Sequence, residues 1–383
     1  MTADEIAAFI FFALIAIRLY KKRKKIRFYS LFFLEPWKGG MDWLDRFIAK
    51  HKRLISKVEA LSLYTGFALM SVGIGFILYS LVQMKQTLAI VLPSVGGIKY
   101  PGPVVSVPFW YWLIAIFVIA FPHETFHAIF SKNENVKIKK YGIIYFILLP
   151  LGAFVEPEKK ALEKLNWKKK GKIFSAGSFV NLLTAGIAFM LLILTNKAAM
   201  FLMKPIGINY TTIPGTPAYK ANLSGTMIRI NNHRIRTIHD LVHVLNSSKP
   251  GENITIYTTK GFFNVTLAER KGKAFLGISN LTEIFSFAPT GSILPNWIVK
   301  SIFYWSNLLF WIFILSLGVA IANMLPAKPL DGGLTIEAFL KEKFGKKKGM
   351  KIANVISIFV WILLIISLVS GNIQKLIGGL QFS

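Results

Sequence analysis

The sequence predicts a membrane protein: an α-helical bundle of about six transmembrane helices, with a re-entrant β-hairpin and an inserted α+β domain. Three observations predict this fold class. Hydrophobic residues make up 54% of the 383 residues, which is high for a soluble globular chain. They are gathered into long, nearly uninterrupted blocks. Strongly basic connections separate several of these blocks.

Five apolar blocks are long enough to cross a bilayer as helices, because a hydrocarbon core of ~30 Å needs roughly 20 helical residues. They are residues 60–81, 107–130, 173–195, 298–325 and 352–370. A sixth block, 6–20, is shorter but strongly apolar. Its start is acidic and its basic cluster follows the apolar run, so we expect a retained helix and not a cleavable signal peptide.

The net charge of +28 does not predict nucleic-acid binding, because Lys and Arg gather in the connections 21–57, 131–172 and 341–351. The connection 84–106 contains only Lys85 and Lys99. The positive-inside rule then places the three basic connections in the cytoplasm, and both termini and residues 84–106 outside. We therefore expect a multi-pass protein of the cell membrane, with the lipid bilayer as its partner.

One polar insertion, roughly 204–290, interrupts the helices. It contains strand-like segments at 226–230, 253–257 and 261–267 and a short amphipathic helix at 237–245. The predicted plan is transmembrane helices 1–4 over residues 1–200, an extracytoplasmic domain over 201–290, and transmembrane helices 5–6 over 291–383.

The segment 141–155 (YGIIYFILLPLGAFV) is apolar but too short to span as a plain helix, and Pro150 and Gly152 interrupt it. Non-helical backbone at membrane depth is tolerated only where protein or a wet cavity surrounds it. The segment therefore predicts a re-entrant hairpin or loop. The alternative is an apolar cytoplasmic loop packed on the bundle.

Ionisable residues concentrate near the end of the third block, in His123-Glu124-Thr125-Phe126-His127. The i, i+4 spacing puts both histidines on one helical face, where they can bind one metal ion, and Glu124 beside them can take a proton from water. The chain has no cysteine, so a third ligand must be His, Asp or Glu. Asp331, after the last residues of the 298–325 block, is the candidate. The alternatives are a mutually satisfied polar cluster and, for Asp331, a loop-capping turn.

These motifs resemble those of a known family. HETFH, together with NMLPAKPLDGG, is similar to the two signature motifs of the site-2 protease family of intramembrane metalloproteases. The stretch 175–181 (SAGSFVN) resembles the family's AGPxxN motif, with Ser178 in place of proline. The insertion resembles the PDZ domain that many members carry. The family's Asn-x-x-Pro and Leu-Asp-Gly pattern falls on Asn323, Pro326, Leu330, Asp331 and Gly332.

The resemblance implies an intramembrane zinc metalloprotease that cuts single-span membrane proteins. One Zn²⁺ per chain would be held by His123, His127 and Asp331, with Glu124 as the catalytic base and the site toward the cytoplasm. Asn181 and Asn323 are candidates for substrate or oxyanion binding, or alternatively for interhelical hydrogen bonds. The hairpin is expected to accept unwound substrate as an added strand.

The PDZ-like domain is expected to bind a substrate C-terminus or an extended segment. It also motivates an alternative function, a catalytically inactive membrane scaffold that binds peptides through this domain. The insertion contains a second histidine pair at i, i+4, His239 and His243. Because no second motif or third ligand accompanies it, we interpret this pair as surface or groove residues.

Overall fold

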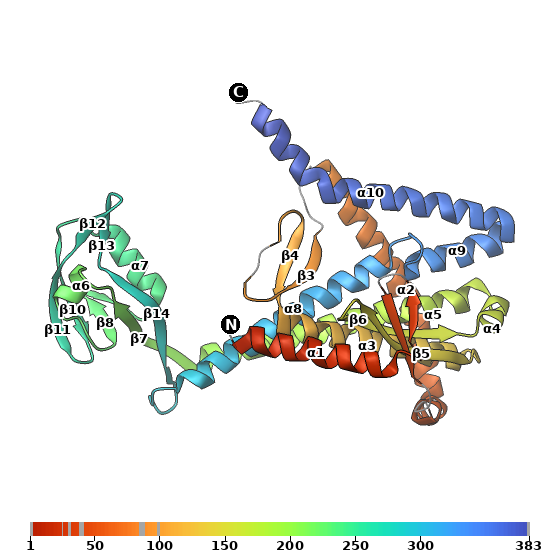
Figure 1. Cartoon of the computed structure of the whole chain (residues 1–383), viewed down its shortest axis with the longest axis horizontal. Coiled ribbons are helices and arrows are strands. Elements are labelled where there is room, and N and C mark those ends of the chain that lie inside the picture. Colours follow the sequence, from red (N-terminus) through yellow and green to blue (C-terminus); the bar gives the residue numbers. More distant parts are fainter. Residues whose placement is uncertain are drawn as a thin grey trace. The chain divides into compact units, whose positions relative to one another are not determined.

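The computed structural model describes residues 3–24, 26–29, 32–37, 42–83, 89–97 and 100–380 (Figure 1). The chain divides into two compact units. The first comprises Met1–Met190 and Leu308–Ser383, and the second comprises Leu191–Asn307. The second unit includes the residues 201–290 that the sequence analysis assigns to an inserted domain.

Five helices in the described part of the chain are long and apolar enough to cross a membrane. Each coincides with one predicted block except at its ends. The helix of the block 298–325 ends two residues early, at Asn323, because Pro326 has no N–H to donate and disfavours helical backbone in the residue before it. The helices are α2 (Asp42–Val82), α3 (Phe109–Asn133), α5 (Trp167–Leu202), α8 (Asn296–Asn323) and α10 (Lys346–Leu380).

The sixth block also forms a helix, α1 (Ala3–Lys22). It is not one of the five membrane candidates, because acidic residues at its start and basic residues at its end leave no sufficiently uncharged stretch of membrane-spanning length. The structure therefore points to a multi-pass membrane protein with five candidate spans. A sixth span stays a prediction.

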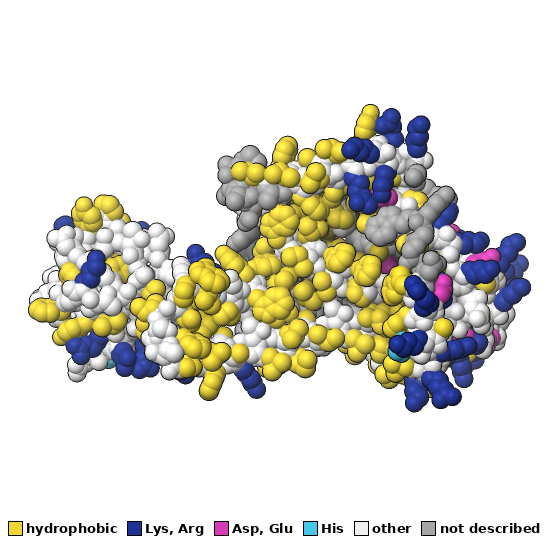
Figure 2. All heavy atoms as spheres, turned by 90° about the horizontal axis from the view of Figure 1, so that it is seen from below, with side chains coloured by type: hydrophobic (Ala, Val, Ile, Leu, Met, Phe, Trp, Pro, Cys, Tyr) yellow, Lys and Arg dark blue, Asp and Glu magenta, His cyan; other side chains and the backbone are white. Residues whose placement is uncertain are grey.

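The outward-facing side chains of the long helices in the first unit are largely apolar, as Tyr64, Phe117 and Ile365 illustrate. Figure 2 shows broad hydrophobic areas on one face of this unit, while Lys and Arg side chains gather at one of its ends. Apolar surface on this scale needs a cover, which lipid would provide. Which side of the membrane the basic end faces stays a prediction.

A four-stranded antiparallel sheet in the first unit has the order β1-β2-β5-β6. Segment 141–155 lies in β5 and β6, so it forms a β-hairpin, with Ile147 at a positive φ of 56° in the turn. β2 covers one edge of the hairpin, and β6 is left as the edge strand of the sheet. That the hairpin is re-entrant stays a prediction. The strands are β1 (Arg27–Tyr29), β2 (Phe32–Trp37), β5 (Ile138–Phe146) and β6 (Leu149–Pro157).

A buried carboxylate ties α1 to this sheet. Glu35 on β2 is 1% exposed and accepts hydrogen bonds of 3.0 Å from both Nε and Nη2 of Arg18 on α1. It also pairs with Lys22 and accepts a 3.1 Å hydrogen bond from the Tyr145 hydroxyl on β5. Burial raises the pKa of Glu35, but the hydrogen bonds from Arg18 and Lys22 outweigh burial and hold the pKa at about 2.

We expect Glu35→Gln to lower the free energy of unfolding by about 1.5–3 kcal/mol, the range for hydrogen bonds to a charged group. The smaller values are favoured because the Arg18 and Lys22 side chains are 45% and 42% exposed and water screens them. A lowered pKa stabilises the fold above the usual value of 4.5, and this contribution is lost as the pH falls toward 2. The thermal unfolding midpoints of the parent protein and of Glu35→Gln, recorded between pH 7 and pH 3, measure this contribution. If the difference between the two midpoints does not narrow on acidification, the stabilising role of the Glu35 carboxylate is contradicted.

Four smaller elements complete the first unit. β3 pairs in parallel with β4, which leads directly into α3. The helix α9 begins at Asp331, directly after the turn that follows α8. The bounds are β3 (Ile90–Ser94), β4 (Val104–Pro108), α4 (Lys159–Lys164) and α9 (Asp331–Phe344).

The second unit is an α+β domain whose main sheet has the order β11-β10-β8-β7-β14, with β9 paired to β8. The predicted strands and the predicted helix are confirmed as β8, β10, β11 and α7. That the domain is PDZ-like stays a prediction. The elements are β7 (Met203–Thr212), α6 (Pro217–Lys220), β8 (Met227–Ile230), β9 (His233–Arg234), α7 (Ile238–Ser247), β10 (Asn253–Thr258), β11 (Gly261–Thr266), β12 (Ala268–Arg270), β13 (Lys273–Phe275) and β14 (Ile278–Phe287).

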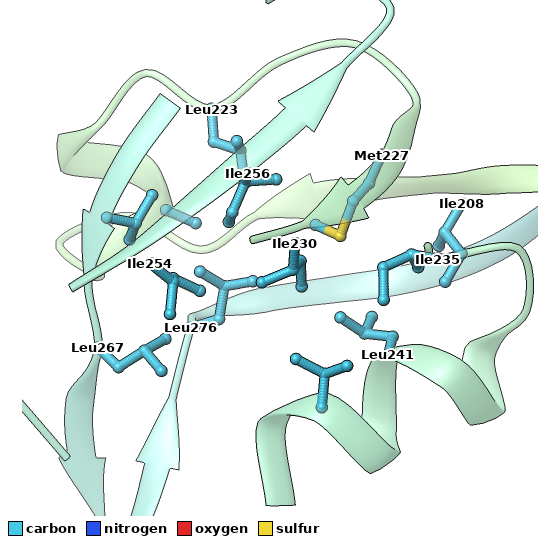
Figure 3. Close-up of a cluster of buried hydrophobic side chains, with 13 residues drawn as sticks. Ile208, Leu223, Met227, Ile230, Ile235, Leu241, Ile254, Ile256, Leu267 and Leu276 are labelled. Carbon is cyan, nitrogen blue, oxygen red and sulfur yellow. The ribbon is translucent and has the colours of Figure 1, made fainter. Parts of the chain in front are cut away.

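This domain has its own hydrophobic core. Ile208, Met227, Ile230 and Ile256 from the sheet face Leu241 of α7 (Figure 3), and each is at most 1% exposed. Alternate apolar residues in the strands and the amphipathic spacing of α7 produce this packing.

Candidate metal centre

The first two candidate ligands come from one face of α3. His123 and His127 are four residues apart, and their Nε2 atoms lie 3.1 Å from each other. The His127 Nδ1–H donates a 2.7 Å hydrogen bond to the carbonyl of Ile173 on α5. Because Nδ1 then carries the proton, the lone pair of His127 is on Nε2, on the side of His123. Small and apolar residues of α3 and α5, including Ala128, Ile173 and Ala176, pack this helix pair.

The third candidate ligand, Asp331, is the first residue of α9. Its Oδ2 atom lies 3.4 Å from the Nε2 atoms of both His123 and His127. One ligand atom from each of the three residues lies within 4.8 Å of the others. The structure thus brings together two parts of the chain that are far apart in sequence, as their motifs predict.

The donor set fits a zinc ion. Asp331 Oδ2 is buried and accepts no well-formed hydrogen bond from the part of the chain that the structure describes. Burying a carboxylate oxygen without a partner is costly, and a cation between this oxygen and the two imidazoles would supply one. Two histidines and one carboxylate are also a usual ligand set for catalytic zinc, with a fourth position left open.

Asn181 and Asn323 both lie against His123. Asn181 on α5 is fully buried, and its amide is 2.9 Å from His123 Nδ1, while its Oδ1 has no partner among the described residues. Rotating this amide by 180° lets Oδ1 accept a hydrogen bond from Nδ1–H and leaves the Nε2 lone pair for a metal. Asn323 Nδ2 is 3.5 Å from His123 Nε2. Their predicted oxyanion role stays a prediction.

Glu124 lies next to the two histidines on α3 and also faces the hairpin. Its carboxylate lies near the backbone N–H of Val155 on β6. It also lines a largely apolar cavity of about 840 Å³. The other lining residues come from α1, the start of α2, α3, β5 and β6, among them Phe11, Phe117, Ala120, Ala153 and Phe154. A carboxylate beside both the ligands and an apolar cavity can exchange protons with a bound peptide.

Two further contacts shape this centre, and the sequence motifs do not reveal them. The Ile173 carbonyl orients His127, but a backbone atom leaves no side-chain signal to read. Gly177 packs against the His123 ring, since a Cβ atom there would be 2.3 Å from Nε2. Small residues flank Gly177, namely Ser175, Ala176 and Ser178, and such a run is the sequence signal that favours close helix packing. The second histidine pair, His239 and His243, is exposed on α7.

Comparison with known proteins decides the family. The sequence model of peptidase family M50 matches residues 111–367, well over half of the chain. The chain belongs to peptidase family M50. The resemblance to the site-2 protease family is thereby confirmed, and with it membership of a family of zinc-dependent peptidases. All the candidate site residues lie inside the M50 match, whereas α1, β1, β2 and α2 precede it.

An uncharacterized protein of Methanocaldococcus jannaschii is one relative of this M50 peptidase. It is 28% identical over 257 residues, which are 65% of this chain and 62% of the relative. The chain therefore spans less than two thirds of the relative's length. Since the relative is uncharacterized, the chemistry must be argued from the M50 site itself.

Proposed function

We propose that this M50 peptidase is an intramembrane zinc endopeptidase that hydrolyses peptide bonds in or near the membrane-spanning segments of single-span proteins. One observation carries the proposal. Three ligand atoms converge: those of His123 and His127 within the membrane-span candidate α3, and that of Asp331 at the start of α9, with Glu124 beside them. Ionisable residues in membrane helices are costly and are rarely present without a function.

The residues divide the chemistry among them. Bound zinc supplies a Lewis acid that polarises the peptide carbonyl and activates water. Glu124 takes the proton from the attacking water and delivers it to the leaving amine. His127 is oriented by the Ile173 carbonyl and His123 by Asn181, so both imidazoles keep their positions during turnover.

An unwound substrate is proposed to join the sheet at β6, because β2 already pairs with the other edge of the hairpin. The N–H of Val155 points away from β5 toward Glu124. In an antiparallel strand, residues two apart direct their backbone groups to the same side, so the N–H of Ala153 also points away from β5. Ala153 lines the cavity beside Glu124 and is thus the position expected to pair with substrate.

We expect Ala153→Pro to slow cleavage about tenfold. It removes one backbone hydrogen bond to substrate, worth about 1–1.5 kcal/mol, and leaves the pairing of β5 with β6 in place. Ala153→Ser keeps the N–H and is the matched control. Initial cleavage rates, together with zinc content, measure the effect. Equal rates for the proline and serine variants at full zinc content would rule out pairing at this position.

Substrate selection is proposed to involve the second unit, as a PDZ-like domain. Its edge strand β14 lies beside α7, since Glu283 of β14 accepts a 2.8 Å hydrogen bond from the Ile238 N–H. An edge strand next to a helix suits an extended chain or a C-terminus. Substrates with free and amidated C-termini test this: a faster reaction of the free carboxylate supports it, and equal rates oppose capture of a C-terminus.

The active site is proposed to face the cytoplasmic side and the second unit the opposite side, on the charge asymmetry of the connections. The chain has no cysteine, so single cysteines can be introduced without background. A cysteine at Lys347 should resist a membrane-impermeant maleimide in intact cells, and one at Lys271 should react. The reverse pattern would invert the topology.

The reaction itself is tested with purified full-length protein in lipid vesicles and a panel of single-span substrates labelled at both ends. We expect fragments whose new termini, identified by mass spectrometry, lie within or beside the apolar span. Cleavage confined to soluble loops far from the membrane would contradict the intramembrane assignment and leave a metalloprotease of another kind.

A further inference from the structure

Asp331 depends on a turn that has little internal structure. Residues 324–330 join α8 to α9, and the backbone bonds within this turn include Ala327 N–H to the Leu325 carbonyl, 2.8 Å, and Leu330 N–H to the Ala327 carbonyl, 2.9 Å. The Asp331 carboxylate must nevertheless stay 3.4 Å from both histidines. Something outside the turn has to hold it.

Two side chains of α10 bind this turn at one residue. The Ser357 hydroxyl accepts a 3.1 Å hydrogen bond from the Lys328 N–H, and the Trp361 indole Nε1–H donates one of 2.9 Å to the Lys328 carbonyl. Ser357 and Trp361 are four residues apart and so lie on one face of α10. Ser357 also donates to the Ala353 carbonyl at 2.8 Å, which directs its lone pairs toward Lys328.

The position of Lys328 is transmitted to Asp331 through backbone contact. A Cβ atom on Gly333 would be 2.5 Å from the Lys328 nitrogen, and one on Gly332 would be 2.0 Å from the Met324 carbonyl oxygen. The turn therefore packs directly on the first turn of α9 with no side chain between them. The Lys328 ammonium also pairs with Glu337 of α9 at 2.5 Å. Moving Lys328 must move the start of α9.

We propose that Ser357 and Trp361 are positioning residues for the third metal ligand, acting by clamping the Lys328 backbone and so fixing the Asp331 carboxylate. This positioning role rests on the metal centre of the proposed function, and it makes α10 part of the support of that centre. Substituting a group that orients a metal ligand typically weakens metal affinity by about 10–100-fold.

The test measures metal binding, not proteolysis. Full-length Glu124→Gln protein is loaded with Co²⁺, and its visible absorption and the rate of Co²⁺ loss to a chelator are recorded. Ser357→Ala and Trp361→Phe in this background are expected to lose Co²⁺ about tenfold faster and to change the absorption bands. Ser357→Thr keeps the hydroxyl and should restore the parent rate.

Ser301 and Trp297 provide matched controls, because they are also a serine and a tryptophan four residues apart on a membrane helix, α8. Ser301→Ala and Trp297→Phe should leave the rate and the spectrum unchanged. Parent-like rates and spectra for both Ser357→Ala and Trp361→Phe would overturn the clamp, as would a Ser357→Thr variant that behaves like Ser357→Ala. A parent protein that binds no Co²⁺ and no Zn²⁺ would instead overturn the proposed function, and the clamp with it.

Discussion

Glutamine in place of Glu124 will slow peptide hydrolysis by orders of magnitude and leave zinc bound at one ion per chain. The amide has nearly the shape of the carboxylate but cannot take a proton from water, so the expected loss in rate is about 10²–10⁴-fold, the usual contribution of a general base. Glu124 is not among the three grouped ligands, which is why the metal should stay. Product formation per hour and zinc per chain by mass spectrometry measure both effects.

His127→Ala and Asp331→Ala are the companion variants. Each removes one of the three ligand atoms, so each should lose both zinc and activity. If Glu124→Gln kept more than a tenth of the parent rate, another base would have to be sought. If it lost its zinc, Glu124 would have to be regarded as a ligand. An inactive parent with a full zinc content would favour the scaffold alternative.

The second large effect is expected at a glycine. In Gly177→Ala, the new methyl group would lie 2.3, 2.4 and 2.5 Å from three atoms of the His123 ring. Real contacts need more than 3 Å, so the ring must move by about 1 Å. A misplacement of this size can cost about 100-fold in rate, and here it also displaces a ligand. We expect loss of zinc and of at least 99% of the activity.

Gly186→Ala on the same helix is the control. No atom of the described residues lies near a Cβ there, sequence neighbours aside, and alanine favours helix more than glycine by roughly 0.5–1 kcal/mol. This variant should keep its zinc and unfold at the same or a higher temperature. Zinc retention by Gly177→Ala would mean that α3 and α5 separate easily, contrary to the packing described above.

Much of this architecture could be predicted because membranes simplify the physics. Blocks of apolar residues such as 173–195 have few alternatives to a spanning helix, and the structure has a helix there. The pairing of HETFH with Asp331 was also predictable, since costly ionisable residues at two helix ends favour a shared site. The strands around 226–230 and 253–257 could be predicted because apolar and polar residues alternate in these segments.

Other features carry no comparable signal. β2 pairs with β5 of the hairpin although the two strands are far apart in the sequence. The pattern of a single sequence does not show which strands pair. The acidic residue in FFLEPW looks exposed until Arg18 and Lys22 are seen around Glu35. A membrane span at α1 stays a prediction, because charged residues lie close to both ends of its short apolar run. Clamps such as Trp361 act on backbone atoms and leave no motif.

The order of the ligands along the chain has a consequence for biosynthesis. His123 and His127 leave the ribosome before the second unit, Leu191–Asn307, and Asp331 leaves after it. A nascent chain therefore carries two imidazoles and no complete centre until the whole second unit has been made and α9 has reached α3. Peptidase activity can therefore appear only in a chain whose second unit, proposed to select the substrates, has already been synthesised. An early arrest in translation would leave an inert helix bundle and not an unselective protease.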